Sequence, residues 1–129
     1  MRVYNKWHSM IKKELKKMNL THPQFVVLAS LAYLSQNSNE VTQIMISKLS
    51  GIDVMTISQI LGLLEKHNFV KRKEHSKDTR AKAVTLNKKG EEILQKAVPL
   101  VEQIDEFFFG KLDSDEEQFK YFLVRLNEE

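Results

Sequence analysis

The chain has 129 residues, of which 42% are hydrophobic, and it contains no cysteine. This length suits one domain with a sizeable core, and the missing thiol excludes a disulfide scaffold, a thiol redox switch and any thiolate metal site. The formal net charge of +3 is unevenly distributed, because residues 1–18 and 66–90 are strongly basic and residues 91–129 are strongly acidic. A local basic stretch indicates a site for a polyanion, although a solvated basic face would give the same pattern.

Neither a signal peptide nor a membrane span is evident in the sequence. The amino terminus has no apolar segment of signal-peptide length, and nowhere do about 18 apolar residues run together. We therefore expect a cytoplasmic protein without a membrane partner.

The first two helices are predicted from apolar spacing and from a start signal. Residues 3–18 carry apolar side chains every three or four positions with lysines between them, which predicts an amphipathic helix. The next helix begins after Thr21, whose spacing to Gln24 fits a capping box, with Pro23 in the first turn. It is predicted to end near Ser35, before a polar loop.

Two shorter helices then form a helix-turn-helix candidate. Thr42 is placed to cap a helix through Leu49, and Gly51 ends it because glycine tolerates the left-handed turn. Asp53 is placed to cap a second helix over residues 54–67. A short turn containing glycine between two helices is typical of this motif.

The helix over residues 54–67 has two faces when successive side chains are stepped by about 100°. The face predicted to be buried consists of Val54, Ile57, Ile60, Leu61 and Leu64. The opposite face consists of Met55, Gln59, Gly62 and Lys66, flanked by Thr56, Ser58 and Leu63. Its polar groups suit hydrogen bonds to base edges and phosphates in a major groove. An ordinary surface helix with a glycine remains the alternative.

A β-hairpin is predicted directly after this helix. The segments "FVKRKE" and "KAVTL" read as strands with Val70, Val84 and Leu86 directed inward, and the basic segment 75–82 lies at their tip. Such a hairpin is a wing that can lie along phosphates or enter a minor groove. Asp78 can accept hydrogen bonds from the Arg80 guanidinium and fix its direction; a free surface ion pair is the alternative.

The C-terminal third is rich in aromatic residues. A long helix is predicted from Asn87 to about Lys111, with a bend at Pro99. Ser114 and Glu117 have capping-box spacing for a last helix. The apolar stripe of that helix is formed by Phe119, Phe122, Leu123 and Leu126. A small winged-helix core has no evident use for all these aromatics, so we expect dimerisation; a private three-helix core in a monomer is the alternative.

Catalytic and metal chemistry find little support in the sequence. The four histidines have no close helical spacing with one another and no carboxylate cluster beside them, so no metal site is predicted. There is no glycine-rich phosphate loop, and the charged wing tip offers no water-excluding pocket for nucleophilic catalysis. We expect neither an enzyme nor a bound cofactor.

The order of these motifs resembles the MarR family of winged-helix transcription regulators. The resemblance runs from Leu20 to about Gly110, and "DTRAKAVTLNKKG" is similar to the Asp-x-Arg wing, the following strand and the glycine of that family. The segments "LTHPQFVVL" and "LEKHNFVKR" resemble its second helix and its strand entry. The departures are Ser47 for a common alanine, Gln59 for a frequent arginine and Asn68 for the usual glycine.

The resemblance implies a homodimer that binds pseudo-palindromic operator DNA, usually as a repressor released by a small ligand. The fold class expected is α+β, mainly α, with a single domain over residues 1–129. Residues 41–86 would form the winged helix-turn-helix part, and residues 1–36 and 87–129 the helical dimerisation region.

Candidate site residues follow from the predicted faces and from the resemblance. For double-stranded DNA they are Thr42, Met55, Thr56, Ser58, Gln59, Lys66, Lys77, Asp78, Arg80 and Lys82. For a small-molecule effector, which the basic first helix would favour as an anion, they are Trp7, His8, Phe25 and Tyr33; plain core or interface roles remain open for these four. The competing function is a winged-helix protein-interaction module or antagonist that does not read DNA.

Overall fold

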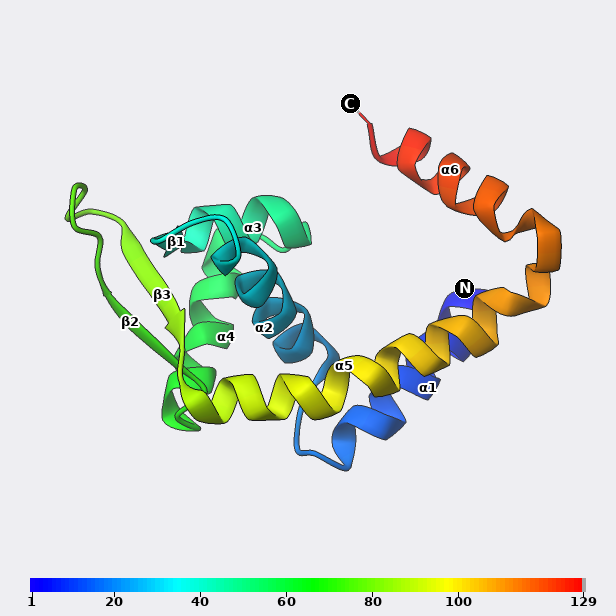
Figure 1. Ribbon diagram of the computed structural model, residues 1–129, viewed down its shortest axis with the longest axis horizontal. Helices are drawn as coiled ribbons and strands as arrows, with labels where there is room; N and C mark the ends of the chain where they lie inside the picture. The colour runs from blue at the N-terminus through cyan, green and yellow to red at the C-terminus, as the bar shows by residue number, and fades with distance from the viewer. Residues whose placement is uncertain (129) are drawn as a thin grey trace.

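The computed structural model describes residues 1–128, which fold mainly as helices with one small sheet (Figure 1). The elements in chain order are α1 (Arg2–Lys16), α2 (His22–Ser35), β1 (Val41–Thr42), α3 (Gln43–Ser50), α4 (Val54–Lys66), β2 (Val70–Glu74), β3 (Lys82–Leu86), α5 (Lys88–Phe109), the 3-10 segment η1 (Gly110–Asp115) and α6 (Glu116–Asn127). Every predicted helix and both predicted hairpin strands are present. The predicted α+β fold with a winged helix-turn-helix is therefore confirmed.

The starts of α2, α3 and α4 are set by side-chain caps. The Thr21 hydroxyl accepts a hydrogen bond from the Gln24 backbone N–H at 3.2 Å, and the Gln24 side chain accepts one from the Thr21 N–H at 3.0 Å. The Thr42 hydroxyl likewise accepts from the Met45 N–H at 3.2 Å. Each cap satisfies backbone donors that have no partner within the helix, which confirms the predicted capping residues.

The turn between α3 and α4 fixes the angle between these two helices. Gly51 has φ of +77°, in the left-handed region that glycine adopts at little cost. The axes of α3 and α4 are bent by 112° to one another, within the range of helix-turn-helix motifs. Within residues 1–128, no single helix is both long and apolar enough to cross a membrane; only α3 and α4 taken as this bent pair meet a length and composition criterion.

The sheet contains one strand more than predicted. Its order is β1-β3-β2, with β3 antiparallel to both neighbours and Val41 opposite Val84. The sequence predicts Thr42 only as the cap of α3, because a two-residue strand carries no periodicity. By adding an edge to the hairpin, β1 joins the base of the wing to the start of α3.

The core of the winged part lies between α2, α3, α4 and the sheet. Leu28 and Leu31 of α2, Ile46 of α3 and Ile57 and Leu61 of α4 are fully buried there. Of the five residues predicted for the buried face of α4, Ile57, Ile60, Leu61 and Leu64 are buried. Val54 was wrongly placed in that set: it is the first residue of α4 and is 41% exposed, so the end of the helix is less covered than its middle.

The entry to β2 and the start of α5 are packed closely together. Asn68 has φ of +62°, a conformation that asparagine tolerates better than most non-glycine residues, and its side-chain oxygen accepts from Asn87 Nδ2 at 3.0 Å. The Asn87 N–H donates to the Phe69 carbonyl at 2.9 Å. Gly90 follows one turn later, where a Cβ would lie 2.2 Å from that same carbonyl oxygen.

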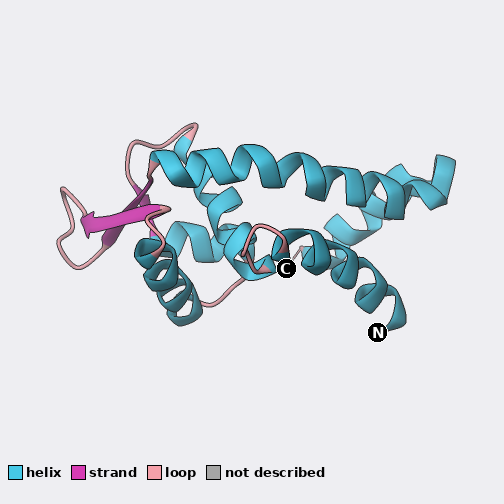
Figure 2. Ribbon diagram, turned by 90° about the horizontal axis from the view of Figure 1, so that it is seen from below, coloured by secondary structure: helices cyan, strands magenta, loops and turns pink. Residues whose placement is uncertain are grey.

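The long helix α5 leads away from the sheet and connects the two ends of the molecule. It runs from the end of β3 to the side of α1, and α6 then projects from its far end (Figures 1 and 2). Pro99 lies inside α5 as predicted. None of the residues of α6 is buried, and Phe119, Phe122, Leu123 and Leu126 are all exposed.

The predicted start of the last helix was wrong. The chain enters α6 from η1, the N-cap residue is Asp115 rather than Ser114, and no side chain caps the helix. Asp115 has nearly helical φ and ψ of −85° and −5°, whereas Asp113 has non-helical φ and ψ of 49° and −122°, so the chain bends at Asp113 just before α6 begins.

Candidate nucleic-acid interface

Helix α4 presents an exposed face whose first turn is fixed by Asp53. The Asp53 carboxylate accepts hydrogen bonds from the Thr56 N–H at 2.9 Å and from the Thr56 hydroxyl at 2.7 Å. These bonds from Thr56 lower the pKa of Asp53. Since the Thr56 hydroxyl already donates to Asp53, what it can offer to DNA is its methyl group and an oxygen lone pair.

Other candidates on α4 point into solvent. Met55 is 73% exposed, and Gln59 and Lys66 are also exposed. Gly62 was expected on this outward face, yet it lies half-buried against Arg72, whose Nη2 would be 3.6 Å from a Cβ at that position. The exposed part of the face is therefore centred on Met55 and Gln59.

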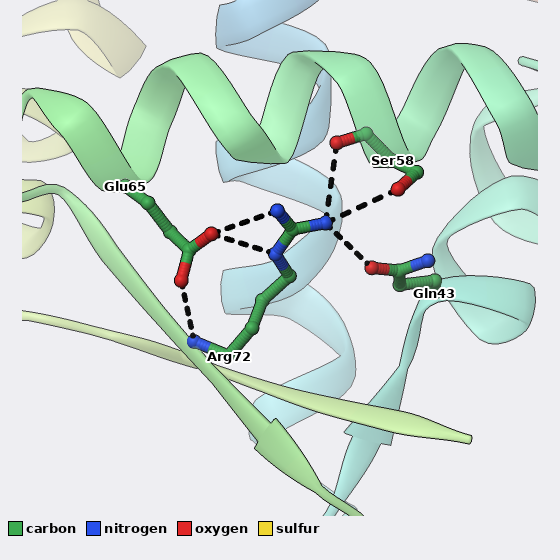
Figure 3. A network of polar contacts seen from close by, with 4 residues as sticks. All are labelled: Gln43, Ser58, Glu65 and Arg72. Atoms are coloured by element: carbon green, nitrogen blue, oxygen red, sulfur yellow. Dashed lines mark hydrogen bonds and ion pairs between the residues drawn. The ribbon is translucent and has the colours of Figure 1, made fainter. Parts of the chain in front are cut away.

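Arg72 of β2 is the centre of a polar network that joins three elements (Figure 3). Its Nε donates to Glu65 Oε1 at 2.8 Å, and its Nη2 lies 2.7 Å from the same oxygen. Its Nη1 donates to Gln43 Oε1 at 3.0 Å and to both Ser58 Oγ and the Ser58 carbonyl at 3.2 Å. Because one planar guanidinium contacts α3 and α4 at once, it fixes the orientation of α4 against the wing.

The wing tip has the ion pair that the sequence predicted. Arg80 Nε lies 3.3 Å from Asp78 Oδ1, and the same oxygen accepts from the Arg80 backbone N–H at 3.1 Å. The Arg80 side chain is 91% exposed, as it would have to be to reach a polyanion. Lys77 and Lys82 are exposed on the same hairpin.

The wing tip is also tied to the loop that follows α2. The Glu40 carboxylate accepts from the Ser76 N–H at 2.9 Å and also from the Ser76 hydroxyl. These bonds from Ser76 lower the pKa of Glu40. His75 Nδ1 accepts from the N–H groups of Lys77 and Asp78 at 3.1 and 3.2 Å, which closes the turn at the tip.

Some of the candidates for DNA contact lie at a hollow between α3, α4 and the wing. Ser58 and Lys82 border one shallow polar hollow together with Gln43, Glu65 and Arg72. Thr42, the N-cap of α3, directly precedes the lining residue Gln43 in the chain. Gln43, Glu65, Arg72 and Glu40 were not singled out from the sequence, because they meet across separations of 7 to 36 residues and no local spacing marks them.

The four effector candidates do not surround one cavity. His8 borders a mainly apolar pocket of about 320 Å³ with Lys12, Lys16 and His22. Trp7 donates from Nε1 to Asp105 Oδ1 at 2.8 Å and so joins α1 to α5. Phe25 is buried in the core, and Tyr33 is exposed beside a separate hollow between α2 and α5.

The pocket beside His8 has a second histidine that the sequence did not single out. The rings of His8 and His22 have centroids 5.2 Å apart. Burial lowers the pKa of His22, and the neighbouring His8 lowers it further, while Asp105 acts in the opposite direction. No cluster of three His, Cys, Asp or Glu residues able to hold a metal occurs within residues 1–128.

Comparison with known proteins places this arrangement among DNA-binding regulators. The profile of the ArnR1-like winged-helix domain matches residues 16–103. The HTH-type transcriptional regulator YdcH of Bacillus subtilis is 35% identical over 104 residues, which cover 81% of this chain and 71% of YdcH.

Solved structures give the same result for the fold. A MarR variant from E. coli, complexed with operator DNA, superposes with a TM-score of 0.84 at 22% identity and covers 99% of this chain and 89% of that one. BpsR of Bordetella bronchiseptica, whose DNA binding is described as regulated by 6-hydroxynicotinic acid, gives a TM-score of 0.82 at 26% identity, covering 96% of this chain and 86% of that one.

Proposed function

Because this chain belongs to the MarR family of winged-helix transcription regulators, we propose that it acts as a homodimeric, ligand-responsive repressor of a pseudo-palindromic operator. Membership makes it a DNA-binding transcription regulator and not an enzyme. We further propose that the protein is a homodimer, that it represses rather than activates transcription, and that particular residues contact DNA. We also place the protein in the cytoplasm, where its DNA target lies.

The observation that carries the DNA-contact proposal is the pairing of an exposed polar helix face with an exposed, oriented arginine. Gln59 and Met55 project from α4, and Arg80 projects from the wing with its guanidinium held by Asp78. In this arrangement α4 enters the major groove while Arg80, with Lys77 and Lys82, contacts the backbone or the minor groove. Lys66, in the last turn of α4, would then lie near the DNA backbone.

The apolar surface of the C-terminal arm, which comprises η1 and α6 (residues 110–127), supports the homodimer. Phe119, Phe122 and Leu126 are exposed in the single chain, as are Val3 and Tyr4 of α1. A second copy that covers these side chains would remove apolar surface from water, the main driving force of association. Two α4 helices would then lie about one DNA turn apart, roughly 34 Å.

The pocket beside His8 supports the proposed ligand response. Its lining is mainly apolar, with Lys12 and Lys16 at its edge, which suits a small aromatic or aliphatic anion. His8 is the effector candidate that borders this pocket. Trp7 contacts the lining residue His22, with ring centroids 5.6 Å apart, and Phe25 and Tyr33 would act only through α2.

The base-reading role of Gln59 provides the test of this function. Glutamine can pair with adenine N6 and N7, a contact that gives about 1–3 kcal/mol of base discrimination. We expect Gln59→Ala to reduce base preference at one symmetric pair of operator positions and to leave affinity for random DNA nearly constant. Selection from randomised duplexes with wild type and variant measures this.

The alternative function, a winged helix that contacts only protein, predicts a different result. Wild-type protein would then bind selected and random duplexes equally weakly at every salt concentration. If instead wild type prefers its selected duplex but Gln59→Ala returns the same operator, the chain reads DNA and Gln59 is not the reading residue.

A further inference from the structure

Arg72 determines which hydrogen-bonding groups its neighbours can present to DNA. A guanidinium carries five N–H donors and no acceptor. Every group that contacts it must therefore offer an oxygen, as Gln43, Ser58 and Glu65 do here at 2.7 to 3.2 Å.

The consequence for Gln43 concerns the orientation of its amide. Its Oε1 accepts from Arg72 Nη1 at 3.0 Å, so its NH2 group is turned away from the guanidinium, as Figure 3 shows. The reverse orientation would bring two sets of donors together. Arg72 thus holds Gln43 with its donor side outward.

The consequence for Ser58 concerns its hydroxyl proton. Ser58 Oγ accepts from Arg72 Nη1 at 3.2 Å, and a hydroxyl has one hydrogen to donate. Because the arginine offers no acceptor, that hydrogen is available to an acceptor outside the network. Gln43 and Ser58 therefore both present donors at the rim of the same hollow.

The charge in this hollow favours an anion despite the presence of Glu65. Glu65 Oε1 accepts from the Arg72 side chain at 2.8 Å, and Oε2 accepts from the Arg72 backbone N–H at 3.3 Å, so the carboxylate is engaged on both oxygens. Arg72 offsets its charge, and exposed Lys82 on the same rim leaves a net positive site.

We propose that Arg72 is a positioning residue that holds Gln43 and Ser58 as paired donors for one phosphate group of each DNA half-site. Phosphate oxygens only accept hydrogen bonds, so two outward donors beside a lysine match them. This inference rests on the proposed DNA contact through α4 and the wing. It assigns Gln43 to the interface and explains why Arg72 need not touch DNA itself.

Replacing Gln43 by glutamate tests the polarity directly. In Gln43→Glu, one carboxylate oxygen keeps the contact with Arg72 while the other presents negative charge where a donor stood. We expect operator affinity to fall by about tenfold or more, since like charges meet at close range. Gln95→Glu, at an exposed position of α5 outside the winged part, makes the same change in net charge. It should cost less than about twofold, because salt screens a charge that is remote from the DNA.

Arg72→Lys tests the positioning role while keeping the positive charge beside Glu65. An ammonium cannot contact Gln43, Ser58 and Glu65 together in one plane. Phosphate-ethylation interference on the selected duplex should lose the signal at one phosphate in each half-site. The signal at the phosphates near the wing should persist, whereas a general loss of folding would weaken every position alike.

Three outcomes separate this inference from the proposed function. Equal affinities for Gln43→Glu and Gln95→Glu would overturn the inference, and so would an unchanged interference pattern in Arg72→Lys. If Arg72→Lys does not fold, the comparison of Gln43→Glu with Gln95→Glu still tests the inference. Failure of wild type to prefer any duplex would instead reject the proposed function, before either variant is considered.

Discussion

Apolar side chains are buried in the winged part of the chain, residues 41–86. They are exposed in the C-terminal arm, residues 110–127. In the winged part Ile46, Ile57 and Val84 are almost completely buried, whereas in the arm no residue is buried and Leu126 is 83% exposed. The winged part therefore completes its core within one chain. The exposed apolar side chains of the arm have no covering surface within residues 1–128, and a second copy would supply one.

The largest expected effect comes from placing charge on the arm. Phe122→Asp combined with Leu126→Asp should convert the dimer to a monomer at micromolar concentration, because buried unpaired carboxylates are strongly unfavourable. Loss of the second half-site contact should weaken operator binding by about 10²- to 10⁴-fold. Sedimentation equilibrium and fluorescence anisotropy measure the two effects.

A matched control keeps this first experiment specific. Leu49→Asp with Thr85→Asp adds the same charge at exposed positions of the winged part, outside the helical dimerisation region, and it should leave the dimer intact. A doubly substituted arm that still sediments as a dimer would show that the interface lies elsewhere and would remove the contrast drawn here.

The second prediction concerns Gly90, at the junction between the two regions. In Gly90→Ala the new Cβ would lie 2.2 Å from the Phe69 carbonyl oxygen and 3.1 Å from Leu86 Cδ2. Because backbone must move to admit it, we expect a loss of about 1–3 kcal/mol in the free energy of unfolding. Urea titration measures it, and Gly110→Ala, with no atom within 4 Å of the new Cβ, is the control. Equal stability of both variants would contradict the close packing described.

The third prediction separates DNA contact from assembly. Arg80→Ala should weaken binding to selected and random duplexes alike and reduce the salt slope by about one per wing, as expected for one lost phosphate contact. The dimer should be unaffected, since the hairpin tip between β2 and β3, which contains Arg80, lies at the opposite end of the molecule from α6 (Figure 1). Asp78→Ala should have a smaller effect, because it removes only the orientation of Arg80. Unchanged affinity of Arg80→Ala for both duplexes would exclude the wing from binding.

The smallest effect concerns the pH dependence of stability near α1. Burial and His8 lower the pKa of His22 below 6.5 in the folded chain. Folding thus favours the neutral imidazole: its contribution is complete above the unfolded value and is lost as pH falls from about 6.5 through the folded value. His22→Gln should flatten the unfolding free energy across that acidic window. Chemical denaturation at a series of pH values checks this, and an unchanged slope would show that His22 titrates as a free side chain.

Local signals in the sequence predicted much of the winged part. The caps at Thr21, Thr42 and Asp53 and the pair Asp78 and Arg80 involve partners two or three residues apart. Such spacings reflect backbone geometry alone, so they need no knowledge of the fold. The predicted glycine turn at position 51 was confirmed for the same reason.

The Arg72 network and the tether at Glu40 could not be predicted in this way. Arg72 meets Gln43 across 29 residues and Ser76 meets Glu40 across 36, so their contacts depend on how α3, α4 and the sheet pack. The errors at Val54 and Ser114 have related causes. A helical wheel treats every turn as equally covered, and a capping motif does not reveal that the chain bends at Asp113 just before the helix.

The hydrogen bonds between Glu40 and Ser76 couple the loop after α2 to the wing. Residues 36–40 follow the end of α2, and the Glu40 carboxylate accepts hydrogen bonds from both the N–H and the hydroxyl of Ser76 in the wing tip. α2 begins at His22, beside the pocket next to α1. A small rotation of α2 about its axis would move Glu40 and, through its hydrogen bonds, Ser76. The angle of the wing is therefore coupled to the position of α2.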